Sequence, residues 1–139
     1  MRIALVVADF YPELAREMLE AAKEGLGELG ATPARIVRVS GCLEMPLFIN
    51  ELLEQQEIDA VVCLGAIIQG ETSHDVMIAE ALYQRAAELS VKHGKPVAMG
   101  VSGPRQTRAM AEARTRLFAR RAIEAAVKSL EELGKLREE

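Results

Sequence analysis

Several patterns are missing from this chain of 139 residues, and each absence excludes a class of protein. No apolar stretch approaches the roughly 20 residues that a membrane-spanning helix needs. Basic residues are not in excess, because 17 lysines and arginines against 21 acidic residues leave a net charge of -4. That balance does not favour nucleic acid or an anionic membrane as a partner. Cys42 and Cys63 lack the spacing of a metal or redox motif and are expected to be reduced thiols.

Low-complexity segments, linkers and internal repeats are also missing, and the length suits one domain over residues 1–139. Hydrophobic residues make up 50% of the chain and charged residues 27%, a balance typical of a globular protein. The apolar run from Ile3 to Val7 is short, and Ala8-Asp9-Phe10 after it is more typical of a strand end than of a cleavage site. We therefore expect a soluble protein of the cytoplasm.

Short apolar runs alternate with helical patterns along the chain. The runs 3–7 and 60–65 are continuous, which is typical of parallel strands buried on both faces. Further strands are predicted at 36–39, where interrupting arginines indicate a sheet edge, and at 97–101. In the helix predicted after the second strand, Leu47, Leu52 and Leu53 are expected to face inward. The predicted helices span 12–29, 44–54, 72–93 and 102–136.

Four consecutive βα units predict an α/β fold with three layers, a flavodoxin-like α/β/α sandwich around a four-stranded parallel sheet. In such a sheet a ligand binds beyond the carboxyl ends of the strands. That rule assigns the binding site to four loops, 9–11, 40–44, 66–74 and 102–105.

The third loop, Gly65 to His74, carries the clearest chemical pattern. Thr72 or Ser73 can cap the helix that follows, and the free amides of a helix start form an anion site. His74 lies in the first turn of this helix, where the positive helix end favours a neutral imidazole able to accept a proton. A helix cap beside a solvated histidine accounts for the same residues equally well.

For the other candidate binding residues, the amino-acid pattern alone favours a structural role over a binding role. Phe10 follows the first strand and can stack on a flat heterocycle, although core packing is the commoner use of such a residue. Glu44 can accept hydrogen bonds from a polyol, but it also suits the dipole of a helix start. The arginines of the last helix either clamp a phosphate or form a solvated charged face, and their spacing does not decide which arginine would act.

The same loops resemble those of lumazine synthases, particularly the compact archaeal-type ones, over nearly the whole chain. The segment Gly65-Ala66-Ile67-Ile68-Gln69-Gly70-Glu71-Thr72-Ser73-His74 is similar to the family's G-x-x-I-x-G-x-T-x-H segment, and Phe10 stands at the family's aromatic after the first strand. The segments 39–46, 96–104 and 121–126 are similar to three further family segments. Because the motifs follow in the family's order, the chain is identified as a member.

The resemblance implies the condensation of 5-amino-6-(ribitylamino)uracil with 3,4-dihydroxy-2-butanone 4-phosphate to 6,7-dimethyl-8-ribityllumazine, the penultimate step of riboflavin biosynthesis, without cofactor or metal. It implies that His74 transfers protons. The residues implied to bind phosphate are Gly70, Glu71, Thr72 and Arg114, the arginine from a neighbouring subunit. Those implied to bind the pyrimidine and the ribityl chain are Phe10, Cys42, Leu43, Glu44, Ile67, Ile68 and Met99.

The resemblance also implies a homo-oligomer with its sites between subunits, either a pentamer or a 60-subunit icosahedral shell. Its partners are then small-molecule substrates, with no nucleic acid and no membrane. The chain departs from the family at Ser40, where proline is usual, at Leu43, where many members have phenylalanine, and at Tyr11, where asparagine is common. The last helix does not align without a gap, so Arg116 remains an alternative to Arg114.

Two other functions stay open on the sequence. An archaeal-type riboflavin synthase has a related fold, but its reaction has no phosphorylated substrate for the segment Gly70 to His74. A non-catalytic flavin- or lumazine-binding protein on the same fold is favoured by the departures at Ser40 and Leu43. It predicts tight riboflavin binding without turnover.

Overall fold

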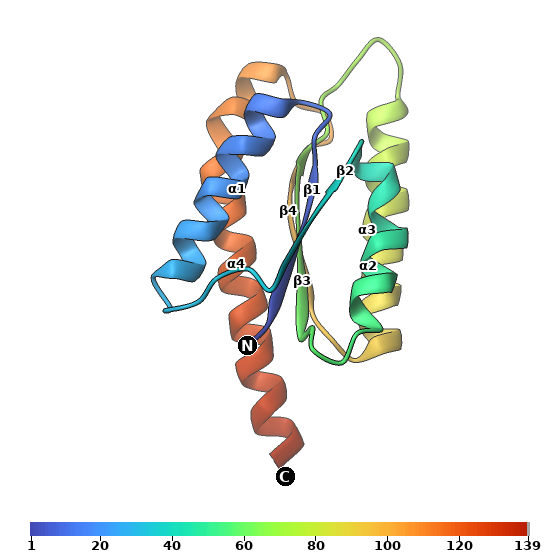
Figure 1. Ribbon diagram of the computed structural model, residues 1–139. Coiled ribbons are helices and arrows are strands. Elements are labelled where there is room, and N and C mark those ends of the chain that lie inside the picture. Colours follow the sequence, from blue (N-terminus) through green and yellow to red (C-terminus); the bar gives the residue numbers. More distant parts are fainter. Residues whose placement is uncertain (139) are drawn as a thin grey trace.

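The computed structural model describes residues 1–138, which form one four-stranded parallel sheet with helices on both faces (Figure 1). The strands lie in the order β2-β1-β3-β4. The predicted three-layer α/β fold is thereby confirmed. In chain order the elements are β1 (Ile3–Ala8), α1 (Pro12–Gly27), β2 (Arg35–Val39), the 3-10 helix η1 (Cys42–Glu44), α2 (Met45–Leu53), β3 (Ala60–Ala66), α3 (His74–His93), β4 (Val97–Ser102) and α4 (Arg108–Glu138).

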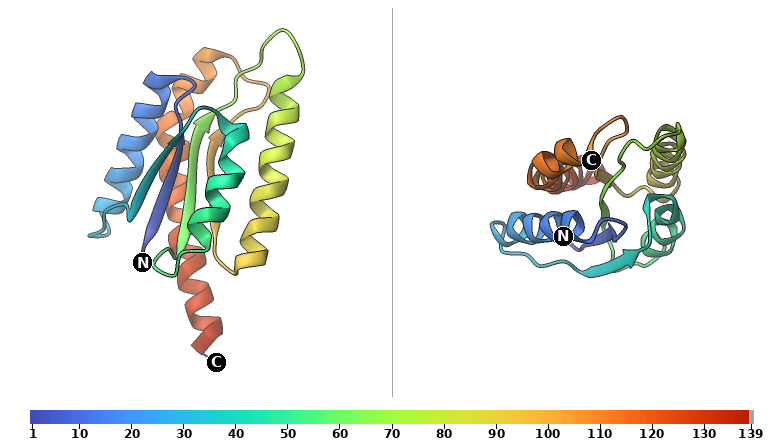
Figure 2. Two further views of the ribbon diagram at one scale, coloured as in Figure 1. Left: turned by 45° about the vertical axis from the view of Figure 1, so that its right-hand side comes forward. Right: turned by 90° about the horizontal axis from the view of Figure 1, so that it is seen from above.

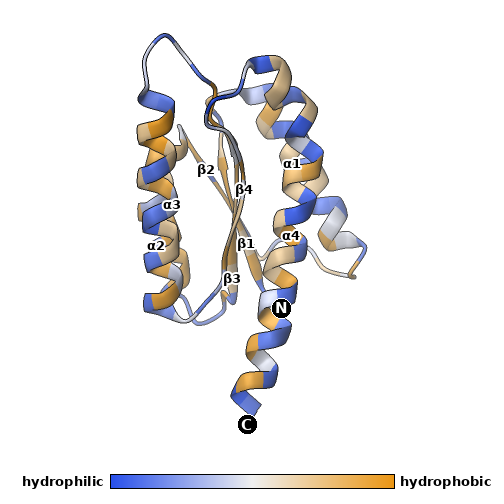
Figure 3. Ribbon diagram, turned by 180° about the vertical axis from the view of Figure 1, so that it is seen from behind, coloured by the Kyte–Doolittle hydropathy of each residue, from blue (hydrophilic) through white to orange (hydrophobic). Residues whose placement is uncertain are grey.

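Two helices cover each face of the sheet. Helices α1 and α4 lie side by side on one face, and α2 and α3 lie on the other (Figure 2). Successive side chains of a strand point to opposite faces, so each buried strand supplies both apolar layers. In β1, Leu5 packs with the α1 and α4 cluster, whereas Val6 packs with the α2 and α3 cluster. Figure 3 shows the result as apolar strands between helices with mixed surfaces.

The positions of the strands in the sheet match the expectations from the sequence. Every residue of β1 and β3 is buried, and both strands are central. Strand β2 is at an edge, with Arg35 and Arg38 exposed. None of the helices within residues 1–138 is long and apolar enough to span a membrane.

The inward face of α2 differs from the prediction at one position. Leu52 and Leu53 are buried as expected, but Leu47 is 65% exposed. Met45 and Ile49 complete the buried face instead, because positions four, seven and eight residues apart share one side of a helix. Leu47, two residues after Met45, points to the other side.

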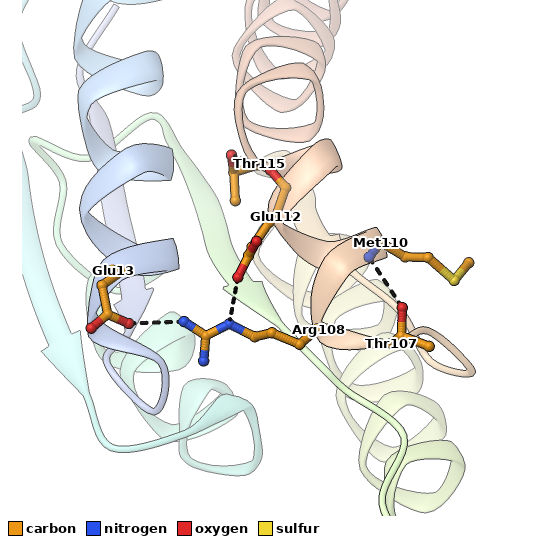
Figure 4. A network of polar contacts seen from close by, with 6 residues as sticks. All are labelled: Glu13, Thr107, Arg108, Met110, Glu112 and Thr115. Carbon is orange, nitrogen blue, oxygen red and sulfur yellow. Dashed lines mark hydrogen bonds and ion pairs between the residues drawn. The ribbon is translucent and has the colours of Figure 1, made fainter.

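Two helices begin later than predicted. Helix α3 begins at His74 and not at position 72, and α4 begins at Arg108 and not at position 102. Gly103 and Arg105 have φ angles of 95° and 59°, which no α-helix contains, so 103–107 is a loop. The hydroxyl of Thr107 accepts a hydrogen bond from the Met110 amide at 3.2 Å and caps α4 (Figure 4).

Candidate active site

The loops after β1, β2 and β3 enclose a pocket of about 410 Å³ at the carboxyl ends of the strands. This volume is within the range of small-ligand sites. Three of the four predicted loops contribute, while the loop after β4 does not line the pocket. The lining residues are Phe10, Tyr11, Gly41, Cys42, Leu43, Glu44, Ala66, Ile67, Ile68, Gly70, Thr72, His74, Asp75 and Ile78.

An exposed aromatic residue forms one wall of the pocket. Phe10 is 68% exposed, so the alternative that it packs in the core is wrong. Its ring meets the edge of Tyr11 with centroids 5.0 Å apart and planes at 69°. Ile67 and Ile68 supply apolar surface to the same pocket. An aromatic ring with free surface beside aliphatic side chains suits a flat heterocycle.

A charged cluster behind this wall holds Tyr11. The Arg108 guanidinium lies 5.4 Å from the centre of the Tyr11 ring, within the range of a cation–π contact. Arg108 also donates to Glu13 at 2.8 Å and to Glu112 at 3.1 Å (Figure 4). The hydrogen bond from Arg108 lowers the pKa of Glu13 below its usual value. The cluster thus joins the starts of α1 and α4 beside the aromatic pair.

The β2 loop brings a carboxylate close to Phe10. A Cβ built on Gly41 would lie 3.1 Å from the Glu44 Oε1 atom and 3.9 Å from the Phe10 ring, so the glycine leaves room for both side chains. Glu44 precedes α2, yet its side chain makes no capping hydrogen bond there. The carboxylate is therefore available to hydroxyl groups of a ligand beside the aromatic wall.

The thiol of Cys42 lies in the same loop and is buried against the sheet. Burial, assisted by the nearby Glu44 carboxylate, raises the pKa of Cys42 to about 12. Because the thiolate is the nucleophilic form of cysteine, Cys42 is inert at neutral pH and serves as an apolar wall. Burial likewise raises the pKa of Cys63, and both cysteines are free.

The start of α3 forms the opposite side of the pocket. The amide of His74 lies 3.4 Å from the hydroxyl of Thr72, whereas Ser73, at the N-cap position, makes no side-chain cap. The His74 side chain is exposed and lines the pocket together with Gly70 and Thr72. Glu71 does not line it. The amide groups of a helix start and an imidazole therefore share one end of the pocket.

Asp75 is a lining residue that the sequence did not single out. Its side chain is 6% exposed, and Oδ2 accepts a hydrogen bond from the Arg105 amide at 2.9 Å. This contact ties the start of α3 to the loop before α4. A carboxylate in the first turn of a helix is too common to be a signal, and its partner is 30 residues away in the sequence.

No lysine or arginine of residues 1–138 lines the pocket. Arg116 pairs across to α1, with Glu24 and, at 3.8 Å, with Glu17. Arg114 is half-buried and donates from Nη1 to the Gln106 Oε1 atom at 3.1 Å. No ion pair within the described part of the chain includes Arg114.

The structure therefore brings most, but not all, of the expected site residues together. Met99 is half-buried in β4, packs with the α2 and α3 cluster and does not line the pocket. Glu71 and Arg114 also lie outside the lining of this chain's pocket. Residues 1–138 contain no group of three histidine, cysteine or acidic side chains placed to hold a metal ion.

Comparison with known proteins gives a consistent result. The profile of the 6,7-dimethyl-8-ribityllumazine synthase family matches residues 1–134. The chain is 46% identical to a 6,7-dimethyl-8-ribityllumazine synthase of Methanopyrus kandleri over 136 residues, which are 98% of this chain and 96% of the relative. It is 44% identical to a protein of the same name from Methanothermobacter thermautotrophicus over 128 residues, 92% of this chain and 91% of the relative.

Proposed function

This chain belongs to the 6,7-dimethyl-8-ribityllumazine synthase family, and we propose that its pocket joins 5-amino-6-(ribitylamino)uracil to 3,4-dihydroxy-2-butanone 4-phosphate. The observation that carries the proposal is the family match over residues 1–134, a span that contains every residue lining the pocket. The enzyme is a transferase of riboflavin biosynthesis. An archaeal-type riboflavin synthase is not favoured, because the relatives carry the lumazine synthase name over nearly their full length.

The aromatic end of the pocket binds the pyrimidine substrate. The ring stacks on Phe10, while Ile67 and Ile68 complete an apolar slot. Glu44 accepts hydrogen bonds from ribityl hydroxyls, and the backbone near Cys42 and Leu43 assists. Phe10 and Glu44 both lie close to Gly41 and therefore to each other. This arrangement supports the binding of one ligand whose ring reaches Phe10 and whose polyol chain reaches Glu44.

The α3 end of the pocket binds the butanone phosphate. The amides near Gly70 and Glu71 and the Thr72 hydroxyl receive the phosphate at the helix start. His74, on the first turn, transfers protons as the amine attacks the ketone, water leaves and an imine forms. Phosphate is then eliminated, which turns the neighbouring hydroxyl-bearing carbon into a ketone through its enol. The ribityl-bearing nitrogen attacks this ketone and closes the ring with loss of a second water. The chain's contribution is to hold two reactive molecules in contact and to move these protons.

An arginine from a neighbouring copy completes the phosphate site. A phosphate dianion is best bound by a guanidinium, yet no cation of residues 1–138 lines the pocket. Arg114 suits this role better than Arg116, because Arg116 is neutralised by α1 carboxylates and Arg114 is not. Met99 does not line the pocket of its own chain either, and we assign it to the pocket of a neighbouring copy.

The functional unit is therefore a homo-oligomer with its sites between subunits, either a ring of five or a 60-subunit shell. Size-exclusion chromatography with light scattering distinguishes these two assemblies. We also propose that the enzyme acts in the cytoplasm, where its free thiols stay reduced.

Absorbance of the lumazine product tests the activity directly. Purified protein with both substrates is expected to form product well above a protein-free blank, which is needed because the condensation also proceeds slowly unaided. A rate equal to the blank, from folded protein that binds riboflavin, would contradict the synthase function. That result would favour a non-catalytic binding protein on this fold.

Arg114→Ala is expected to raise KM for the butanone phosphate by roughly 10- to 100-fold, because a charged hydrogen-bond partner of the phosphate is lost. KM for the pyrimidine substrate should stay near its original value. Arg116→Ala is the matched control, since it removes the same charge from the same helix and should leave both constants unchanged. An unchanged KM in Arg114→Ala together with a raised KM in Arg116→Ala would transfer the phosphate role to Arg116.

A further inference from the structure

Gln106 is a fully buried polar side chain between the pocket and α4. It lies in the loop after β4, and the binding roles proposed above do not include it. The amide Nε2 donates to the Ser102 hydroxyl at 2.8 Å and to the Ile67 carbonyl at 3.3 Å. The amide oxygen accepts from Arg114 at 3.1 Å. The nitrogen and the oxygen of the Gln106 side-chain amide thus both have hydrogen-bond partners, which belong to β4, to the loop after β3 and to α4.

The partners of Gln106 belong to the pocket loop as well as to α4. Ile67 lines the pocket, and the backbone amide of Gln69 donates to the backbone carbonyl of Gln106 at 2.9 Å. Gly103 permits this close approach, because a Cβ there would lie 2.0 Å from the Ile67 carbonyl oxygen. Gln106 is therefore immobilised by the same backbone that forms the pocket wall.

A neutral amide acceptor affects the charge of a bound arginine differently from a carboxylate. An arginine has five donor hydrogens on a long flexible stem, and one fixed acceptor orients the guanidinium while most donors remain free. Glu24 orients Arg116 too, but it also cancels the charge. The neutral Gln106 leaves the positive charge of Arg114 intact for an anion.

We propose that Gln106 is a positioning residue that orients Arg114 for the phosphate of the butanone substrate. The inference rests on the proposed phosphate role of Arg114. Gln106 touches no substrate; it acts by restricting the Arg114 guanidinium to one direction, from which it binds the phosphate in the pocket of a neighbouring copy. Binding of the phosphorylated substrate then requires less ordering of the arginine side chain.

A double-mutant cycle tests this role. Gln106→Met keeps the side-chain length but removes the amide, and it is expected to raise KM for the butanone phosphate about tenfold, with kcat and KM for the pyrimidine substrate nearly unchanged. In the Arg114→Ala background the same replacement should cause no further rise, because the group through which Gln106 acts is already gone. Steady-state kinetics with each substrate varied in turn measure both effects.

Ser102→Ala is the matched structural control. It removes one partner of the Gln106 amide but leaves the contact with Arg114, so it is expected to lower the melting temperature without changing KM for the phosphate substrate. If Gln106→Met does not fold, Gln106→Asn, which withdraws the amide from Arg114 by one methylene, should show the same selective rise in KM.

The outcomes separate this inference from the function on which it rests. Additive effects of Gln106→Met and Arg114→Ala would overturn the positioning role and leave Arg114 as the phosphate residue. An unchanged phosphate KM in Arg114→Ala would overturn both. Equal effects of Ser102→Ala and Gln106→Met on that KM would show that Gln106 is only structural.

Discussion

Replacing His74 with alanine is expected to lower kcat by about a hundredfold, and by no more than about 10⁴-fold, which is the range of general acid–base catalysis. Measurable activity should remain, because holding the two substrates in contact supplies the larger part of the acceleration, on the order of 7–11 kcal/mol for well-oriented reactants. The pocket walls that hold them, Phe10 and the Ile67 segment, are untouched by the replacement. Rates of lumazine formation above the protein-free blank measure the effect.

The chain offers a matched control in its other histidine. His93 lies at the far end of α3, where its ring is hydrogen-bonded to Asn50 at 2.8 Å, and it lines no part of the pocket. His93→Ala should leave kcat unchanged at temperatures below its melting transition. Added imidazole is expected to restore part of the lost rate only in His74→Ala and not in His93→Ala. Complete loss of catalysis in folded His74→Ala would show that proton transfer, and not proximity, dominates.

Gly103→Ala is expected to destabilise the protein by roughly 3–5 kcal/mol. The added Cβ would lie 2.0 Å from the Ile67 carbonyl oxygen, a backbone atom that cannot move aside alone, and the φ of 95° disfavours any side chain. Because the pocket loop must shift, activity should fall with stability. Thermal melting followed by circular dichroism at a fixed protein concentration provides the measurement.

Gly134→Ala is the control for this replacement. Gly134 lies in α4, and a Cβ there meets nothing within 4 Å, so alanine should raise stability by about 0.5–1 kcal/mol through its higher helix propensity. Opposite signs for the two glycines are the expected result. A melting temperature of Gly103→Ala within one or two degrees of the original would contradict the close approach of the two loops.

The site residues that could be predicted from the sequence lie in loops that follow strands. Continuous apolar runs identify β1 and β3 as buried parallel strands, and parallel strands end at the same edge of a sheet. The loops that carry Phe10, Glu44 and His74, far apart in the chain, could therefore be expected at one edge of the sheet, whereas the binding roles of these side chains followed from the family resemblance. Each of these residues lies within a few residues of the end of a strand or the start of a helix, and the local sequence pattern predicts where strands end and helices begin.

Other features depended on contacts between distant segments. Leu47 was expected to face inward because it is apolar, but the direction of α2 on the sheet exposes it. Asp75 and Gln106 have ordinary neighbours in the sequence. The partner of Asp75 lies 30 residues away, and Gln106 is joined to Ile67, 39 residues away, as well as to Ser102 and Arg114. Met99 was expected near the pyrimidine, yet the course of β4 keeps it from the pocket of its own chain.

The sequence by itself determined the layers, the order of the elements along the chain and the loops that bear the site, because hydrophobic periodicity and turn residues are local properties. Only the tertiary structure distinguished Arg114 from Arg116. The two arginines lie on the same helix with similar neighbours, but α1 places Glu24 against Arg116, and the loop after β4 places a neutral amide against Arg114. Charge neutralisation depends on which group lies opposite in space, and a one-dimensional pattern does not contain that information.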